Sequence, residues 1–344
     1  MSNMNKKSKT LENDIDISSY LYIVKAVAIV SVVSAHTSPV PDNTGTFNFL
    51  CSRILNSLGT MGVPVFFLLA GFFFEKNTRK WKEFWKNKLV TIIVPWICCA
   101  TILWLYVVIR KGGIEFESWF WFVYGRTSTM YYLKVLVELY IILFFLKQYK
   151  WFLYIFIGLS GASILLSGWS ENILNVWFGN VYCNLFNWIG YFGIGILIQR
   201  RKLLIKLVYW AERLVGIWIL LYVMTSWLHY SQGWSWTYWS KFALLNIFLQ
   251  CAICFGIASV LMRTKRFSKC LIEVGKNSFS IYLTHQLIVG VIVYITNIVE
   301  IGIVTLARPF ITIILWNIGM GGAIYVVKRY FPRMKKCFMV LGLR

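Results

Sequence analysis

Acidic side chains, and charged side chains in general, are scarce in this chain. Only 14% of the 344 residues are charged, with 13 Asp and Glu against 35 Lys and Arg. A soluble domain carries about 25% charged residues, so the composition argues against a soluble enzyme. Apolar residues take their place: 58% of the chain is hydrophobic and 18% is aromatic, in long uncharged runs. The composition therefore predicts an all-α, polytopic membrane protein.

Three further features are lacking, and each absence argues against a class of protein. The apolar segments are continuous rather than alternating in and out, which argues against a membrane β-barrel. The basic residues lie in short loops rather than on one soluble face, so we expect no nucleic-acid binding. The eight cysteines lie mostly within or beside apolar runs, and Cys251 and Cys254 have no second ligand pair nearby. We therefore expect packed thiols, with no disulfide framework and no metal site.

Apolar runs of about 17 to 25 residues, each long enough to cross a bilayer as a helix, occur ten times along the chain. The predicted spans are Leu21–Val40, Leu58–Phe74, Leu89–Ile109, Met130–Leu146, Trp151–Ser167, Val181–Ile198, Leu207–Trp227, Phe242–Met262, Ser278–Val299 and Ile303–Val327. Lys and Arg collect in alternate loops, as they do on the cytoplasmic side of membrane proteins. This alternation predicts about ten spans with both termini in the cytoplasm.

The ends of the chain are polar. We predict cytoplasmic tails at residues 1–19 and 329–344, the second one basic, on either side of a membrane domain at residues 20–328. The first apolar run starts late and is long enough to span a bilayer, which is not typical of a signal peptide. We therefore expect this run to be retained as the first transmembrane helix.

Histidine is rare, and two of the three histidines fall inside predicted spans. His36 lies in the first span, eleven residues after Lys25, and His285 lies in the ninth. Eleven helical residues advance about 20° beyond three turns, so Lys25 and His36 share a face, about 16 Å apart, and could form a polar track. An ionisable group at membrane depth indicates function, and imidazole can act as a general base. A hydrogen-bonded structural role is the alternative for each of them, and His229 is expected at the interface.

The densest group of cations lies in a predicted loop from Lys76 to Lys88. Its candidates for binding a phosphorylated cytosolic donor are Arg79, Lys82, Lys86 and Lys88. Lys and Arg bind phosphate groups readily, which favours this hypothesis. Positive-inside topology and contact with anionic lipid explain the same residues without a donor.

Lys134 and Glu138 lie one helical turn apart inside the fourth predicted span. An ion pair between them would make their burial tolerable, whereas Lys134 could instead extend to the outer interface. Proton handling or acceptor binding is a further hypothesis for this pair. Glycines around the second span, among them Gly62 and Gly71, predict close helix packing.

Five short motifs follow one another along the chain. They are Lys25 and His36 with ten residues between them, Gly62-Val-Pro-Val-Phe-Phe-Leu-Leu-Ala-Gly71, Tyr131-Tyr-Leu133, Tyr191-Phe-Gly-Ile-Gly195 and Ser280-Ile-Tyr-Leu-Thr-His285. In these motifs, and over most of its length, the chain resembles the acyltransferase 3 family of bacterial integral-membrane acyltransferases. It looks like the members that O-acetylate surface polysaccharides. One departure is that Lys88 and Thr91 stand where the family commonly carries two arginines.

The resemblance implies transfer of an acetyl or other short acyl group to a hydroxyl of a cell-surface or lipid-linked polysaccharide. The donor would be cytosolic acetyl-CoA, which is a substrate and not a permanently bound cofactor. His36 would be catalytic with Lys25 and His285, the basic loop would bind the donor, and Lys134 and Glu138 are candidates for substrate binding. Direct transfer and a transient acyl-histidine both stay open.

The resemblance also implies a place in the bacterial inner membrane, in contact with membrane lipids. A polysaccharide exporter or flippase-like transporter without acyl transfer is the alternative function. The sequence does not predict the acceptor sugar or the oligomeric state.

Overall fold

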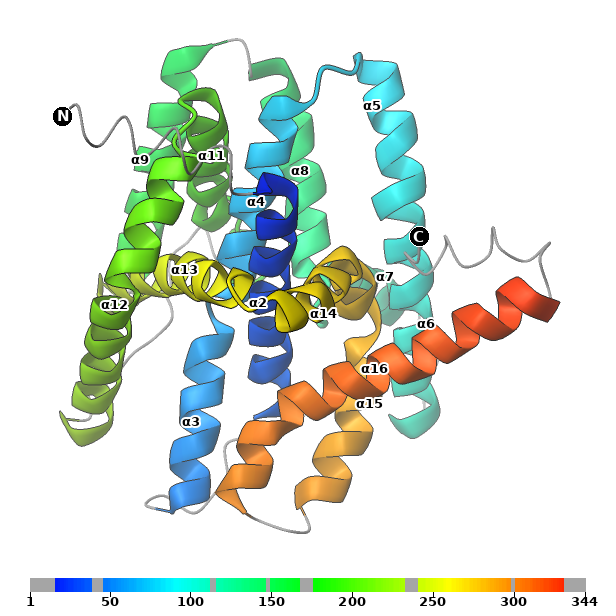
Figure 1. Cartoon of the computed structure of the whole chain (residues 1–344). Coiled ribbons are helices and arrows are strands. Elements are labelled where there is room, and N and C mark those ends of the chain that lie inside the picture. Colours follow the sequence, from blue (N-terminus) through cyan, green and yellow to red (C-terminus); the bar gives the residue numbers. More distant parts are fainter. Residues whose placement is uncertain are drawn as a thin grey trace.

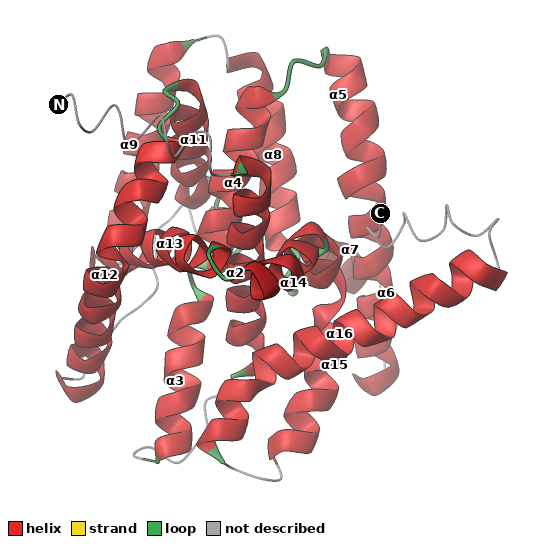
Figure 2. Cartoon of the chain, viewed as in Figure 1, coloured by secondary structure: helices red, strands yellow, loops and turns green. Residues whose placement is uncertain are grey.

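The computed structural model describes residues 16–38, 46–111, 116–146, 149–167, 176–232, 241–297 and 301–330. All regular secondary structure within these ranges is helical, as Figure 2 shows, which confirms the all-α prediction. The predicted tails lie almost entirely outside the described residues, and so does the side chain of His229.

The helices of the bundle are shown in Figure 1. In chain order they are α2 (Ile17–Thr37), α3 (Phe47–Gly59), α4 (Gly62–Lys76), α5 (Trp81–Lys88), the π-helical turn η1 (Leu89–Ile93), α6 (Val94–Lys111), α7 (Phe116–Tyr124), α8 (Tyr131–Leu146), α9 (Lys150–Ser167), α11 (Phe186–Arg200), α12 (Leu204–Gln232), α13 (Lys241–Met262), α14 (Lys265–Lys276), α15 (Ser278–Asn297) and α16 (Gly302–Tyr330). Most predicted spans match one of these helices to within a few residues.

Helical stretches in the described ranges are long and apolar enough to cross a membrane in five places. These are Ile17–Thr37, Trp81–Ile109, Leu204–Met224, Ser278–Thr296 and Gly302–Gly319. Trp151–Leu166 and Gln250–Met262 are shorter apolar helices. The protein is thus a polytopic helical membrane protein, while the count of ten spans and the position of the termini stay predictions.

Four helices lie where the sequence predicts loops, namely α3, α5, α7 and α14. All four are short, and α14 also carries its cations among apolar residues, so none has the long uncharged run by which spans are found. α5 continues through η1 into α6, and the third predicted span is therefore the C-terminal part of a longer helical stretch. The predicted basic loop from Lys76 to Lys88 is mostly helix, which corrects the sequence prediction.

α2 lies in the middle of the bundle and contacts α3, α4, α13, α14, α15 and α16 (Figure 1). The helix begins where the carboxylate of Asp16 accepts a hydrogen bond from the backbone N–H of Ser18, 3.0 Å away. Further along, the hydroxyl of Tyr20 donates to the carbonyl of Phe255 on α13 at 2.9 Å. This central place explains why both Lys25 and His36 lie among other helices rather than facing lipid.

Glycines bring the backbones of α4 and α11 together. A methyl group added at Gly71 would lie 2.0 Å from the carbonyl oxygen of Phe192, and one at Gly195 would lie 1.9 Å from that of Leu68. Gly62 meets α2 in the same way, with an added methyl 2.6 Å from a backbone oxygen. No larger residue permits this approach, so the predicted close packing is confirmed.

Candidate active site

His36 and His285 lie side by side between α2 and α15. The centroids of the two rings are 5.2 Å apart, and the ring planes are inclined by 38°. His285 is fully buried, whereas His36 keeps part of its surface exposed. The structure therefore brings two of the predicted site residues into contact, and His36 is the less buried residue of the two.

Backbone carbonyls of α15 fix the tautomer of His285. Its Nδ1 lies 3.0 Å from the carbonyl oxygen of Ile281 and 2.8 Å from that of Tyr282. A carbonyl oxygen only accepts hydrogen bonds, so Nδ1 carries the hydrogen and donates it. Nε2 then holds the lone pair, and the amide nitrogen of Gln286 lies 3.5 Å from it. His285 is thus held as an acceptor at Nε2.

Hydrogen bonds on two sides of α15 fix its rotation around His285. The hydroxyl of Tyr282 donates to the carbonyl of Thr129 at 2.5 Å. About half a turn further along α15, in the direction of α16, the indole Nε1–H of Trp316 donates to Oγ1 of Thr284 at 2.7 Å. Because both anchors lie within three residues of His285, they hold its ring against that of His36.

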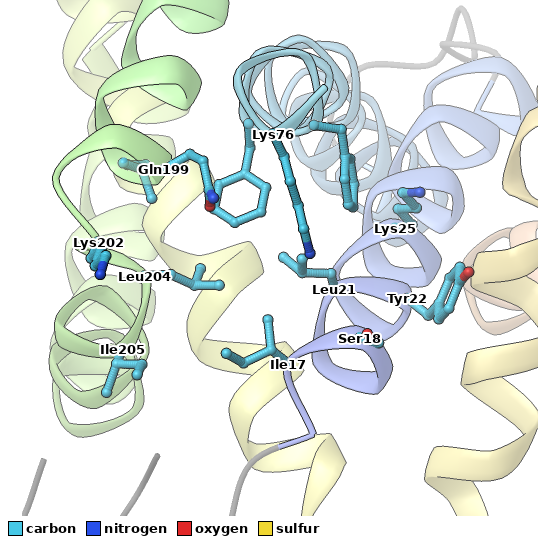
Figure 3. Close-up of a pocket in the computed structure, with 13 residues that line it drawn as sticks. Ile17, Ser18, Leu21, Tyr22, Lys25, Lys76, Gln199, Lys202, Leu204 and Ile205 are labelled. Atoms are coloured by element: carbon cyan, nitrogen blue, oxygen red, sulfur yellow. The ribbon is translucent and has the colours of Figure 1, made fainter. Parts of the chain in front are cut away.

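A cavity of about 310 Å³ lies at the N-terminal end of α2, next to the ends of α4 and α11 and the start of α12 (Figure 3). Its polar lining residues are Ser18, Tyr22, Lys25, Lys76, Gln199 and Lys202. The remaining walls are aliphatic and aromatic. Gln199 and Lys202 are not among the predicted site residues, because nothing in the sequence shows that the turn after α11 meets the start of α2.

Lys25 lines this cavity and does not reach His36. Its Nζ lies 4.7 Å from the ring centroid of Phe73 on α4. On the face of α2 between Lys25 and His36 lie Ile29 and Val32, which are 0% and 3% exposed. That face is therefore apolar, which corrects the expected polar track.

The predicted donor-binding cations lie on and just before α5, away from the cavity lining. Three of the four are exposed, namely Arg79, Lys82 and Lys86. The fourth, Lys88, is partly buried, with its Nζ 3.2 Å from the hydroxyl of Tyr140 and 4.4 Å from the centroid of that ring. Lys88 thus links α5 to α8, and it is Lys76, from the same basic segment, that lines the cavity.

Lys134 and Glu138 form the predicted ion pair on α8. Lys134 Nζ lies 2.9 Å from Oε1 of Glu138. It also donates a hydrogen bond to the carbonyl oxygen of Cys183, 3.0 Å away. The lysine is only 3% exposed, so the alternative in which it extends to the interface is wrong. Its ammonium also lies 4.8 Å from the ring centroid of Tyr124 on α7. These contacts are with α7 and the segment before α11.

Sequence reasoning missed a further buried cation. Arg308 on α16 is 2% exposed, and its signal in the sequence is a single cation inside the last predicted span. In the described part of the chain, no group of three histidine, cysteine or acidic side chains is placed to hold a metal ion.

Comparison with known families identifies the class of protein. A sequence model described as an acyltransferase domain matches residues 18–327, which is most of the chain. The protein therefore belongs to the acyltransferase 3 family and is a multi-pass membrane acyltransferase. No curated protein and no solved structure matched the chain.

Proposed function

We propose that this protein is an O-acyltransferase of the bacterial inner membrane. It moves an acetyl or other short acyl group from acyl-CoA to a hydroxyl of a cell-surface or lipid-linked polysaccharide. The family membership supports the reaction class, and the pair of imidazoles inside the bundle, with 5.2 Å between ring centroids, carries the proposal. An imidazole in a water-poor site is suited to removing the proton of an alcohol.

The proposed step is a direct transfer. The imidazole of His36 takes the proton from the acceptor hydroxyl while that oxygen attacks the carbonyl carbon of the thioester. The carbon–sulfur bond breaks, the thiolate of coenzyme A takes the proton from the imidazolium, and the products are an ester and free coenzyme A. His36 has this role because it is the less buried residue of the pair, whereas the fully buried His285 acts through it as a positioning residue.

The donor is proposed to arrive at the end of α2 that carries Lys25. This end has the cavity, and the exposed cations of the neighbouring basic segment would attract a phosphorylated donor by their charge. Because acyl-CoA is cytosolic, this end faces the cytoplasm in the proposal. The apolar face at Ile29 and Val32 suits passage of an uncharged thioester arm, and that passage requires neighbouring helices to separate.

The acceptor is proposed to enter from the opposite side of the membrane, with Lys134 and Glu138 as candidates for binding it. Oε2 of Glu138 is buried and has no hydrogen-bond partner within the described residues, which leaves an acceptor site for a sugar hydroxyl. A local movement of α8 would be needed to expose this oxygen.

The test is acyl transfer by the purified protein. The protein in lipid nanodiscs receives radiolabelled acetyl-CoA and envelope polysaccharide, and mass spectrometry locates the new ester. His36→Gln should lower kcat by about 100- to 10,000-fold, the usual contribution of a general base. His229→Gln, which changes the histidine outside the predicted site, should keep full activity. Undiminished transfer by His36→Gln would remove the mechanism, and glycan transport by vesicles with no ester formed would favour the exporter.

A further inference from the structure

Lys202 has a backbone conformation that lysine rarely adopts. Its φ is 52°, and no other non-glycine residue in the described ranges has a positive φ. It follows the C-cap of α11 at Arg201, and the N–H of Leu203 donates to the carbonyl of Ile198 at 2.9 Å. Helix ends with this hydrogen bond usually carry glycine at the left-handed position, because a Cβ is disfavoured there.

The side chain of Lys202 explains why lysine is useful at this position. It lines the cavity together with Lys25 of α2 and Lys76 at the end of α4, and Gln199 is added from the last turn of α11 (Figure 3). Three cations from three separate segments thus line one cavity. Strained backbone conformations gather at functional sites, and like charges are brought together where an anion offsets their repulsion.

We propose that this cavity binds the phosphate groups at the nucleotide end of the acyl-CoA donor, with Lys202 and Lys76 as binding residues. The inference rests on the proposed function, from which the donor is taken. Lysine is a common phosphate-binding residue that acts as a point charge. The cavity, at about 310 Å³, is at the small end of ligand sites, so it holds one end of a long donor.

The position of the cavity favours the donor over other phosphate compounds. Lys25 and His36 are about 16 Å apart along α2, so a ligand anchored at the cavity can extend its pantetheine arm toward the imidazoles. The headgroup of an anionic lipid carries the same phosphate chemistry, and the experiment must separate these two sources.

The test compares binding of coenzyme A with binding of pantetheine, which lacks the nucleotide phosphates. Isothermal titration calorimetry is carried out in nanodiscs of neutral phosphatidylcholine and repeated with phosphatidylglycerol added. Lys202→Gly and Lys76→Gln should each raise the Kd of coenzyme A about tenfold and leave that of pantetheine unchanged. Lys206→Gln is the matched control, because Lys206 is an exposed cation on α12 outside the cavity lining, and it should bind coenzyme A normally.

The glycine variant also separates binding from folding. Glycine removes the backbone strain at this position, so the melting temperature of Lys202→Gly should be equal to or above that of the wild type. Weaker coenzyme A binding by a protein that is no less stable supports a ligand role for the side chain. Lys202→Arg should restore most of the binding.

Three results would overturn the inference. They are an unchanged Kd of coenzyme A in both cavity variants, an equal rise for coenzyme A and pantetheine, and an effect of the variants that appears only with phosphatidylglycerol present. The last result would assign the cavity to a lipid headgroup. Because binding is measured without turnover, a protein that binds coenzyme A through these lysines but transfers no acyl group would contradict the proposed function alone.

Discussion

The two ends of α2 differ in almost every physical respect. At one end Lys25 lines a cavity shared with other cations, and at the other end His36 lies against the fully buried His285. The face of α2 between these two ends consists of buried aliphatic side chains. One end is suited to attracting an anion by charge, and the other to moving a proton where water is scarce. In such an arrangement, binding and chemistry can be changed separately.

The largest expected effect is a contrast between substitutions at these two ends. His36→Gln should lower kcat by at least 100-fold with little change in the KM for acetyl-CoA, because the general base is lost while the cavity stays intact. Lys25→Gln should mainly raise that KM. Steady-state kinetics on both variants check this contrast. If both substitutions changed kcat and KM alike, the division of α2 into two sites would be wrong.

The second largest effect is expected from a substitution in the buried ion pair of Lys134 and Glu138. Glu138→Gln leaves the ammonium of Lys134, which is 3% exposed, without its carboxylate. Breaking a buried ion pair in this way costs about 3 kcal/mol of folding stability. Thermal unfolding should also show that the double replacement Lys134→Met with Glu138→Leu is less destabilising than Glu138→Gln alone. Equal losses would mean that the charge is solvated in the folded protein.

A substitution at the glycine contact between α4 and α11 tests only the end of α2 that carries the cavity. Gly195→Ala places a methyl group against the carbonyl of Leu68, so the two helices must separate. Overpacking of this kind costs about 1–3 kcal/mol and should widen the cavity lined by residues of both helices. We expect a lower melting temperature and a higher KM for acetyl-CoA. Gly158→Ala on α9 is the control, because open space surrounds that position.

The smallest effect is expected outside the two sites. Glu273 and Lys276 pair on α14 at 2.7 Å, near the basic end of α2, but both side chains are about half exposed. Water screens such a pair, so Glu273→Gln should leave the kinetics and the melting temperature unchanged within error. A clear loss of donor binding in this variant would extend the donor site beyond the cavity.

The long apolar runs were sufficient to predict the helices that build the bundle, because burial in lipid or protein requires continuous hydrophobic sequence. They could not predict the short helices α3, α5, α7 and α14, and in α5 and α14 cations also interrupt the apolar pattern. The sequence also indicated His36 and His285 separately, since a histidine at membrane depth is conspicuous. Their contact, and the presence of Lys25 and Lys202 in the lining of one cavity, depend on how distant segments cross, which no local pattern encodes.

The side chains that line the cavity are not the residues that hold α4 and α11 together. Gly71 and Gly195 hold α4 and α11 together through main-chain atoms, while Lys76 lies at the end of α4 and Lys202 in the turn after α11. A library that varies Lys76 and Lys202 would therefore leave the scaffold undisturbed. If the proposals above hold, exchanging these two side chains would change the preference for the donor and leave His36 and His285 as they are.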